Sequence, residues 1–86
     1  MISRPALLLA TVALLTGSAW AAEKPPQDSK PLSEIAAGVE RAGYSPIVEA
    51  SFDDGSWEVE AYQAGTKYEL RVDPMTGEIK SKRVDN

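Results

Sequence analysis

The hydrophobic pattern of this chain changes period once, and that change restricts its fold more than any other feature. Apolar residues first recur at the i, i+3, i+4, i+7 spacing of one helical face: Leu32, Ile35, Ala36 and Val39. After Gly43 they alternate with polar residues in the runs IVEASF, WEVEAY and KYELRV, which is the period of a half-buried strand. We therefore expect a helix with Pro31 in its first turn, ending near Ala42, and then three strands.

Two glycine-containing turns determine how the predicted strands pair. Asp54-Gly55 is a strong hairpin signal, and Ala64-Gly65 is a weaker one. If each is a two-residue turn, both hairpins direct their apolar residues to one side of the sheet. The expected pairs on that side are Phe52–Trp57, Ala50–Val59, Val48–Ala61, Trp57–Val72, Val59–Leu70 and Ala61–Tyr68. Because the helix has the only other apolar stripe, it must cover that side. The predicted fold is α+β, one N-terminal helix packed on a three- to four-stranded antiparallel β-meander.

The stretch RVDPMTGEIK, residues 71–80, resembles a cation site but is better explained as a turn. It leads into a fourth, short and basic segment that begins at Ile79, which we expect to face Val72. Pro74 sets φ for a type I turn, Gly77 supplies a left-handed residue, and the Asp73 carboxylate accepts N–H groups of the turn. We assign a structural turn role to five residues: Asp54, Gly55, Asp73, Pro74 and Gly77.

The N-terminal residues have the organisation of a secretory signal. Arg4 precedes an apolar run, and Ala19 and Ala21 fit the small-residue pattern before a signal-peptidase cut. We predict a signal peptide at residues 1–21 cleaved after Ala21, a flexible tether at 22–30 and one domain at 31–86. The alternative is an uncleaved anchor, for which the apolar run is barely long enough. Cleavage places the protein in the periplasm or outside the cell.

Composition excludes several kinds of chemistry. The chain has no histidine and no cysteine, so it lacks Ser-His-Asp and Cys-His nucleophilic systems, thiol redox chemistry and ordinary zinc sites. One helix on a small sheet is also a poor scaffold for a substrate cleft, so we expect a non-enzymatic protein without cofactor or metal. Loss of residues 1–21 removes one basic residue and no acidic one, so the net charge of −4 becomes −5. Such a charge disfavours nucleic acid and anionic membranes and favours protein, peptide or cation partners.

The strand pairing brings together a set of residues that are far apart in the sequence. Glu49, Glu60 and Glu69 form a row across the outer face, where like charges directly opposite are unfavourable. Neutralisation by three basic residues is one interpretation: Lys82 at the end of the row, Arg71 and Lys67. The other is a docking surface for a basic peptide or partner, with the outward Tyr62 as a further contact. Three further alternatives remain: a small-ligand or cation-binding protein that uses the acidic outer face, a structural accessory subunit, and strand addition at the exposed sheet edges.

The ordered set of features resembles the PepSY domain family, in particular its small secreted members. The resemblance rests on a signal peptide, an amphipathic helix ending in RAGY, then FDDGSWEVEA and YELRVDPMTGEI, and it extends from Leu32 to about Lys80. It implies an αβββ fold outside the cytoplasmic membrane. PepSY domains occur in the propeptides of secreted metallopeptidases, so the resemblance also implies a role in regulating or inhibiting a peptidase. No peptidase follows in this chain, so such inhibition would act in trans.

Overall fold

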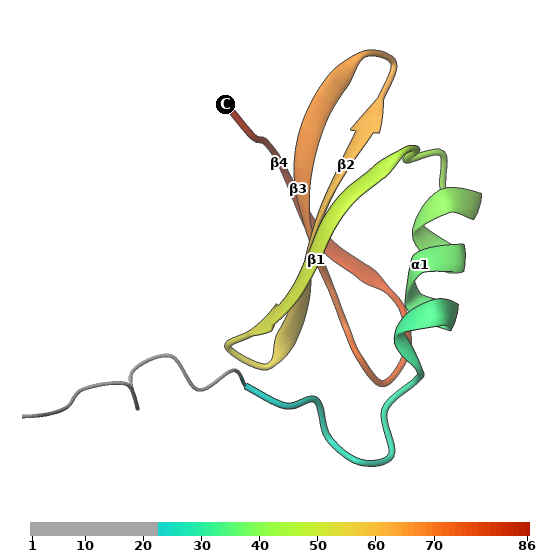
Figure 1. Cartoon of the computed structure of the whole chain (residues 1–86), viewed down its shortest axis with the longest axis vertical. Helices are drawn as coiled ribbons and strands as arrows, with labels where there is room; N and C mark the ends of the chain where they lie inside the picture. Colours follow the sequence, from blue (N-terminus) through green and yellow to red (C-terminus); the bar gives the residue numbers. More distant parts are fainter. Residues whose placement is uncertain (1–22) are drawn as a thin grey trace, which may run out of the picture.

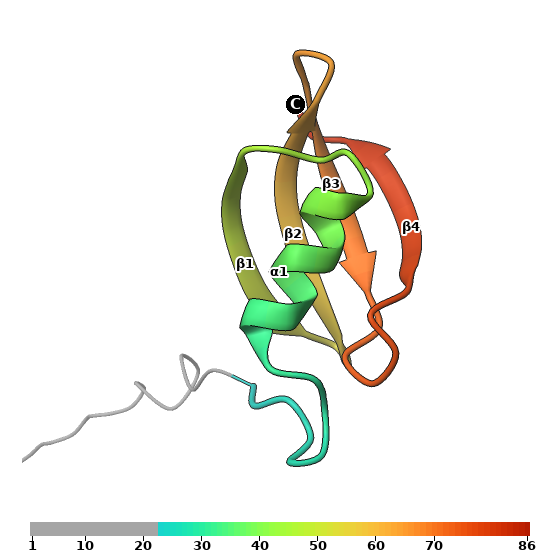
Figure 2. The same cartoon turned by 90° about the vertical axis from the view of Figure 1, so that its right-hand side faces the viewer.

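The structure, a computed structural model, describes residues 23–86, and the predicted signal peptide and cleavage site lie outside these residues. Helix α1 (Leu32–Arg41) precedes four strands: β1 (Ile47–Asp53), β2 (Ser56–Gln63), β3 (Thr66–Val72) and β4 (Ile79–Val84). The strands form one antiparallel sheet in the order β1-β2-β3-β4. Figures 1 and 2 show α1 lying across one face of this sheet. The predicted α+β fold is therefore confirmed, with the fourth strand present.

Helix α1 buries the predicted apolar stripe at its centre and exposes it at its start. Ile35 and Val39 are almost completely buried, whereas Leu32, the first helical residue, is 42% exposed. Pro31 lies just before the helix rather than in its first turn. The helix ends at Arg41, and Gly43 has φ 101°, the left-handed region that glycine adopts at low cost just past a helix.

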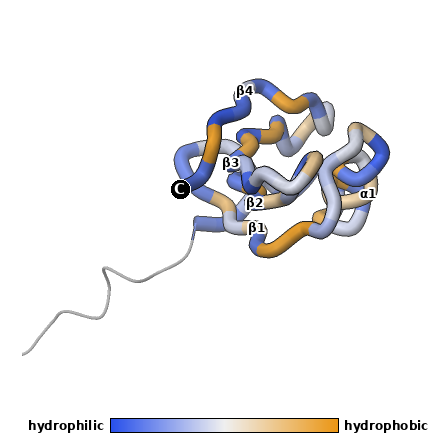
Figure 3. Tube along the Cα trace, turned by 90° about the horizontal axis from the view of Figure 1, so that it is seen from above, coloured by the Kyte–Doolittle hydropathy of each residue, from blue (hydrophilic) through white to orange (hydrophobic). Residues whose placement is uncertain are grey.

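The hydrophobic core lies between α1 and the inner face of the sheet. Figure 3 shows hydrophobic and hydrophilic positions alternating along the strands, as expected when one face is buried. All the predicted pairs between β2 and β3 are confirmed by the register. Two aromatic pairs pack edge to face, Phe52 on Trp57 and Tyr44 on Tyr68. The buried core residues are Ile35, Val39, Tyr44, Trp57, Val59, Ala61, Leu70 and Val72.

The start of β1 differs from the prediction by one residue. Ile47, not Val48, pairs with Ala61, and a β-bulge separates Ile47 from Glu49. Val48 is 54% exposed as a result, so its predicted place in the core is wrong. The extra residue of a bulge interrupts the inward-outward alternation, and here it gives the core position to the larger Ile47.

A second bulge shifts β4. Val72 pairs with Ile79 as predicted, but Arg71 then pairs with Ser81, so Lys80 is an extra residue. The predicted pairing of Arg71 with Lys80 is therefore wrong. Beyond the bulge every β4 residue takes the side opposite to the one expected, because strand side chains alternate with a period of two.

The hairpin turns have the backbone geometry that their sequences favour. Asp54 and Gly55 have φ values of 53° and 80°, and Ala64 and Gly65 have 52° and 82°, so both residues of each turn are left-handed. This is the property of type I′ turns, whose twist matches that of the strands they join. In each hairpin the two residues that flank the turn therefore pair with each other, and this pair fixes the register of the two strands.

Within its described residues, 23–30, the predicted tether hydrogen-bonds to two turns of the domain. The Lys30 N–H donates to the carbonyl of Pro74 at 2.8 Å, and Glu23 Oε1 accepts the N–H of Asp54 at 3.0 Å. Both partners lie in turns at the same end of the sheet, below α1 in Figure 2. No helix of the described chain has the length and apolar character needed to cross a membrane.

Candidate protein-binding face

The outer face of the sheet, which α1 does not cover, bears the three glutamates that the sequence placed in a row. Glu49 pairs with Glu60 in the register of β1 and β2, and Glu60 pairs with Glu69 in that of β2 and β3. Since facing residues of antiparallel strands have Cβ atoms about 5 Å apart, three carboxylates lie side by side. We call Glu49, Glu60 and Glu69 the glutamate row.

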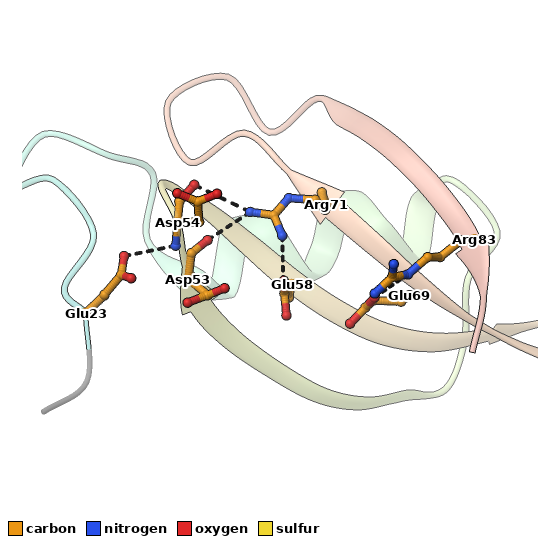
Figure 4. Close-up of polar contacts among 7 residues, drawn as sticks. All are labelled: Glu23, Asp53, Asp54, Glu58, Glu69, Arg71 and Arg83. Carbon is orange, nitrogen blue, oxygen red and sulfur yellow. Dashed lines mark hydrogen bonds and ion pairs between the residues drawn. The ribbon is translucent and has the colours of Figure 1, made fainter. Parts of the chain in front are cut away.

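Basic residues neutralise two members of the glutamate row. Arg83 pairs with Glu69 across β3 and β4, and its Nε donates to Glu69 Oε1 at 2.6 Å (Figure 4). Lys67 Nζ lies 3.6 Å from a Glu60 oxygen and 3.6 Å from Asp85 Oδ2. Glu49 is exposed and has no ion pair within residues 23–86. The unbalanced negative charge of the row therefore lies at its β1 end.

Arg83, rather than Lys82, ends the glutamate row, and the bulge at Lys80 is the reason. It places Lys82 opposite Leu70, on the face that holds the core. There the Lys82 ammonium group lies over the rings of Tyr68 and Tyr44 and donates to Gln63 Oε1 at 3.1 Å. The prediction that Lys82 neutralises the row is thus wrong.

The pKa values at the centre of the row reflect its crowding. The pKa of Glu60 is raised, first by partial burial and then by the charges of Asp85 and Glu49, although Lys67 acts in the opposite direction. The pKa of Lys67 is also raised, chiefly by Asp85, since a nearby carboxylate favours the protonated amine. The surroundings of Glu60 therefore disfavour its charge, and a further cation nearby would relieve that cost.

A second polar group lies on the same face, beside the glutamate row. Arg71 Nη1 bonds Glu58 Oε2 at 2.5 Å, and Arg71 Nη2 donates to the carbonyl oxygens of Asp53 and Asp54 at 2.9 and 3.5 Å (Figure 4). Arg71 thereby links β3 to the end of the β1–β2 hairpin. Its predicted role in neutralising the glutamate row is wrong, because its guanidinium is used by Glu58 and the hairpin.

Tyr62 lies at the end of β2 on the outer face, opposite Lys67 in the register and half-buried. It is thus beside Glu60, as the pairing scheme placed it. The sequence did not predict the place of Arg83 in the glutamate row, and it predicted the wrong face for Lys82. A bulge adds a residue without changing composition, so no local sequence signal distinguishes their two faces.

The outer face offers little for catalysis or metal binding. A shallow hollow of about 150 Å³ lies between β3 and β4, lined by Glu69, Arg71, Ser81, Lys82 and Arg83. Its lining includes two arginines and one glutamate but neither a nucleophile paired with a base nor a pair of free carboxylates. Within residues 23–86, no three side chains of the metal-ligating types converge on one point. The described part of this face therefore presents charged side chains without an arrangement typical of a catalytic or metal site.

Comparison with known families settles the family of the chain. Residues 5–83 match the family model PepSY_2, described as the peptidase propeptide and YPEB domain. The chain belongs to the PepSY family. This confirms the resemblance found in the sequence, and the match covers α1, β1, β2, β3 and nearly all of β4. No curated protein and no solved structure matched in the other two comparisons.

In this PepSY domain the five turn residues have backbone and hydrogen-bonding functions. The Asp73 carboxylate accepts the N–H groups of Met75 and Thr76 at 2.7 and 3.2 Å, and the Gly77 N–H donates to the Asp73 carbonyl at 2.8 Å. Gly77 is left-handed with φ 79°, and Pro74 is buried. Asp54 and Gly55 form the first hairpin turn. PepSY domains are generally non-catalytic and often associated with peptidases, and they are typically extracellular.

Proposed function

We propose that this protein is a non-catalytic binding module that works outside the cytoplasmic membrane and modulates a peptidase in trans. Membership of a family described by peptidase propeptides is the observation that carries the proposal. The absence of histidine and cysteine from the whole chain agrees with a role in binding rather than catalysis.

The outer face is the surface that we propose for the partner. The helix covers the opposite face, and the outer face presents the glutamate row with Tyr62 at its side. Glu49 is the member that lacks an ion pair in the described chain. The pKa of Glu60 beside it is raised, first by partial burial and then by the charges of Asp85 and Glu49. A basic segment of a partner would be attracted to this end of the row.

Inhibition assays test the function directly. The mature protein, residues 22–86, is titrated into peptidases purified from the culture medium or periplasm of the source cells. We expect dose-dependent inhibition or altered maturation of at least one of them. Glu49→Gln should weaken the effect, whereas Glu40→Gln, the same change on the exposed surface of α1, should not. If no co-exported peptidase changes its rate or its processing, the proposed function is wrong.

Export is the second part of the proposal, and it rests on the sequence of residues 1–21. N-terminal sequencing of the protein from a periplasmic extract should give a chain that starts at Ala22. A chain that retains residues 1–21 and sediments with membranes would instead support the uncleaved anchor.

A further inference from the structure

The two edges of the sheet differ in how they are protected from pairing with another strand. Strand β4 has Lys80, Lys82 and Arg83, and lysines on an edge strand commonly prevent edge-to-edge association. Strand β1 has neither a basic residue nor a proline, and its bulge lies at its start, between Ile47 and Glu49. From Glu49 to Asp53 the β1 edge is regular, and no other strand of residues 23–86 pairs with it.

The register identifies the backbone groups that β1 leaves free. The Asp54-Gly55 turn makes Asp53 and Ser56 a hydrogen-bonded pair, and hydrogen-bonded and non-bonded pairs alternate along an antiparallel ladder. Ala50 and Phe52 therefore belong to non-bonded pairs, with their N–H and C=O groups directed away from β2. These are the groups that an added strand would bind.

The side chains along the β1 edge specify the character of that added strand. On the outer face Glu49, Ser51 and Asp53 are exposed, and neither carboxylate has an ion pair in the described chain. On the inner face Ala50 and Phe52 are only half-buried, although both pack against the core. A strand that fits has two basic residues four positions apart on one side and apolar residues on the other.

Charge argues against a second copy of the chain as the occupant. A symmetric antiparallel pair of β1 strands would bond Ala50 to Phe52 of the other copy and place Glu49 opposite its Asp53, which is unfavourable. A symmetric pair of β4 strands would bring Lys82 or Arg83 against itself. Pairing β1 with β4 of another copy matches charges but is head-to-tail, so it leads to open growth rather than a closed dimer.

We propose that β1 accepts an extended basic segment of the partner protein as a fifth strand of the sheet. This inference rests on the proposed function and names the edge and the chemistry of the segment. Backbone hydrogen bonds from Ala50 and Phe52 supply affinity, Glu49 and Asp53 select basic residues, and Phe52 is covered by an apolar side chain of the segment.

A capped peptide with the core Lys-Val-Ser-Val-Lys is the probe. In the antiparallel register its valines face Phe52 and Ala50 and its lysines face Asp53 and Glu49. NMR titration of the mature protein should shift the amide signals of β1 and slow the hydrogen exchange of the Ala50 and Phe52 amides, which have no partner in the free sheet. Shifts confined to β4, or to outer-face side chains without new amide protection, would overturn the proposal.

Variants of the peptide separate strand addition from simple charge attraction. N-methylation of the two valine amides removes the donors that face Ala50 and Phe52, and binding should weaken by about tenfold or more. N-methylation of the serine amide, which faces away, should have little effect. Replacing both lysines with glutamate should abolish binding. Equal binding of the two N-methylated peptides would contradict the proposal even if both bind well.

Variants of the protein link the edge to function and distinguish the two hypotheses. Ala50→Pro removes one free N–H of β1 without breaking its ladder, and Val84→Pro does the same on the β4 edge. Circular dichroism checks that both variants fold, and the peptide variants give the answer if Ala50→Pro does not. We expect Ala50→Pro alone to lose peptide binding and peptidase inhibition. Full inhibition by a folded Ala50→Pro would overturn the β1 site while leaving the proposed function intact. Peptide binding at β1 without inhibition of any peptidase would support the β1 site and contradict the proposed function.

Discussion

The Lys82 ammonium nitrogen lies 4.5 Å from the centroid of the Tyr68 ring and 5.4 Å from that of Tyr44, on the face of the sheet that holds the core. The ammonium group of this lysine contacts two aromatic rings and donates to Gln63 on the inner side of edge strand β4. The bulge at Lys80 produces this arrangement, because it turns Lys82 from the outer to the inner face.

Replacing Lys82 with alanine should lower the free energy of unfolding by about 0.5–1 kcal/mol, since a partly exposed cation over an aromatic ring is lost. Lys80→Ala is the matched control, because Lys80 is exposed and its side chain has no hydrogen bond or ion pair in the described chain. Urea denaturation followed by tryptophan fluorescence measures both. Equal stability of the two variants would show that Lys82 contributes nothing through Tyr68.

The bulge in β1 determines which of two neighbouring residues, Ile47 or Val48, contributes more to stability. Ile47→Ala should destabilise the domain by about 2 kcal/mol, the low end of the range for a core residue, because Ile47 packs against the core but is partly exposed. Val48→Ala should change stability by less than about 0.5 kcal/mol, because Val48 is 54% exposed. The reverse order, measured by thermal denaturation, would indicate the unbulged register in which Val48 faces Ala61.

The sequence predicted those parts of the fold that depend on period and turn chemistry. Two type I′ turns and the alternation of apolar residues were enough to place Trp57, Val59 and Leu70 on one face, because a one-residue slip would expose a whole strand. The glutamate row followed from the same register. Both errors of register occur where a bulge adds a residue, at Val48 and Lys80, and the face of Lys82 and Arg83 changed with the second.

The candidate site was predictable in part for the same reason. Glu49, Glu60 and Glu69 lie where strand pairing placed them, but their ion partners depended on β4, which follows the second bulge. Tyr44, in the connection between α1 and β1, could not be assigned to the core by a periodic pattern. Its burial depends on the chain path after Gly43, which returns Tyr44 toward Tyr68.

The last turn should depend on the Asp73 carboxylate. Asp73→Ala removes the acceptor of the Met75 and Thr76 N–H groups, and we expect a loss of about 1 kcal/mol in the free energy of unfolding. Asp73→Asn retains one side-chain oxygen and should recover most of the stability. Asp28→Ala, at an exposed position of the N-terminal segment, controls for removal of a negative charge. A stable Asp73→Ala variant would show that Pro74 and Gly77 alone specify the turn.

The glutamate row predicts how stability depends on pH. The folded-state pKa of Glu60 is raised above its ordinary value of 4.5, so folding favours its protonated form. That contribution is fully present below the unfolded pKa and is lost as the pH rises through the folded pKa. Glu60→Gln mimics the protonated form, so its stability relative to the wild type should increase from about pH 3 to about pH 7.

Lys67 should stabilise the domain in the pH range where the charge of Glu60 does not, so a Lys67 variant serves as a control for the same experiment. Its raised pKa means that the charged amine stabilises the fold at neutral pH and that this contribution is lost only as the pH rises above 10.5 and through the folded pKa. Lys67→Met should therefore destabilise the domain at neutral pH, whereas Glu60→Gln should not. Glu40→Gln reports the effect of removing one negative charge elsewhere on the domain. If the Glu60→Gln and Glu40→Gln variants show the same pH dependence of unfolding, the crowding of carboxylates at Glu60 has no energetic consequence.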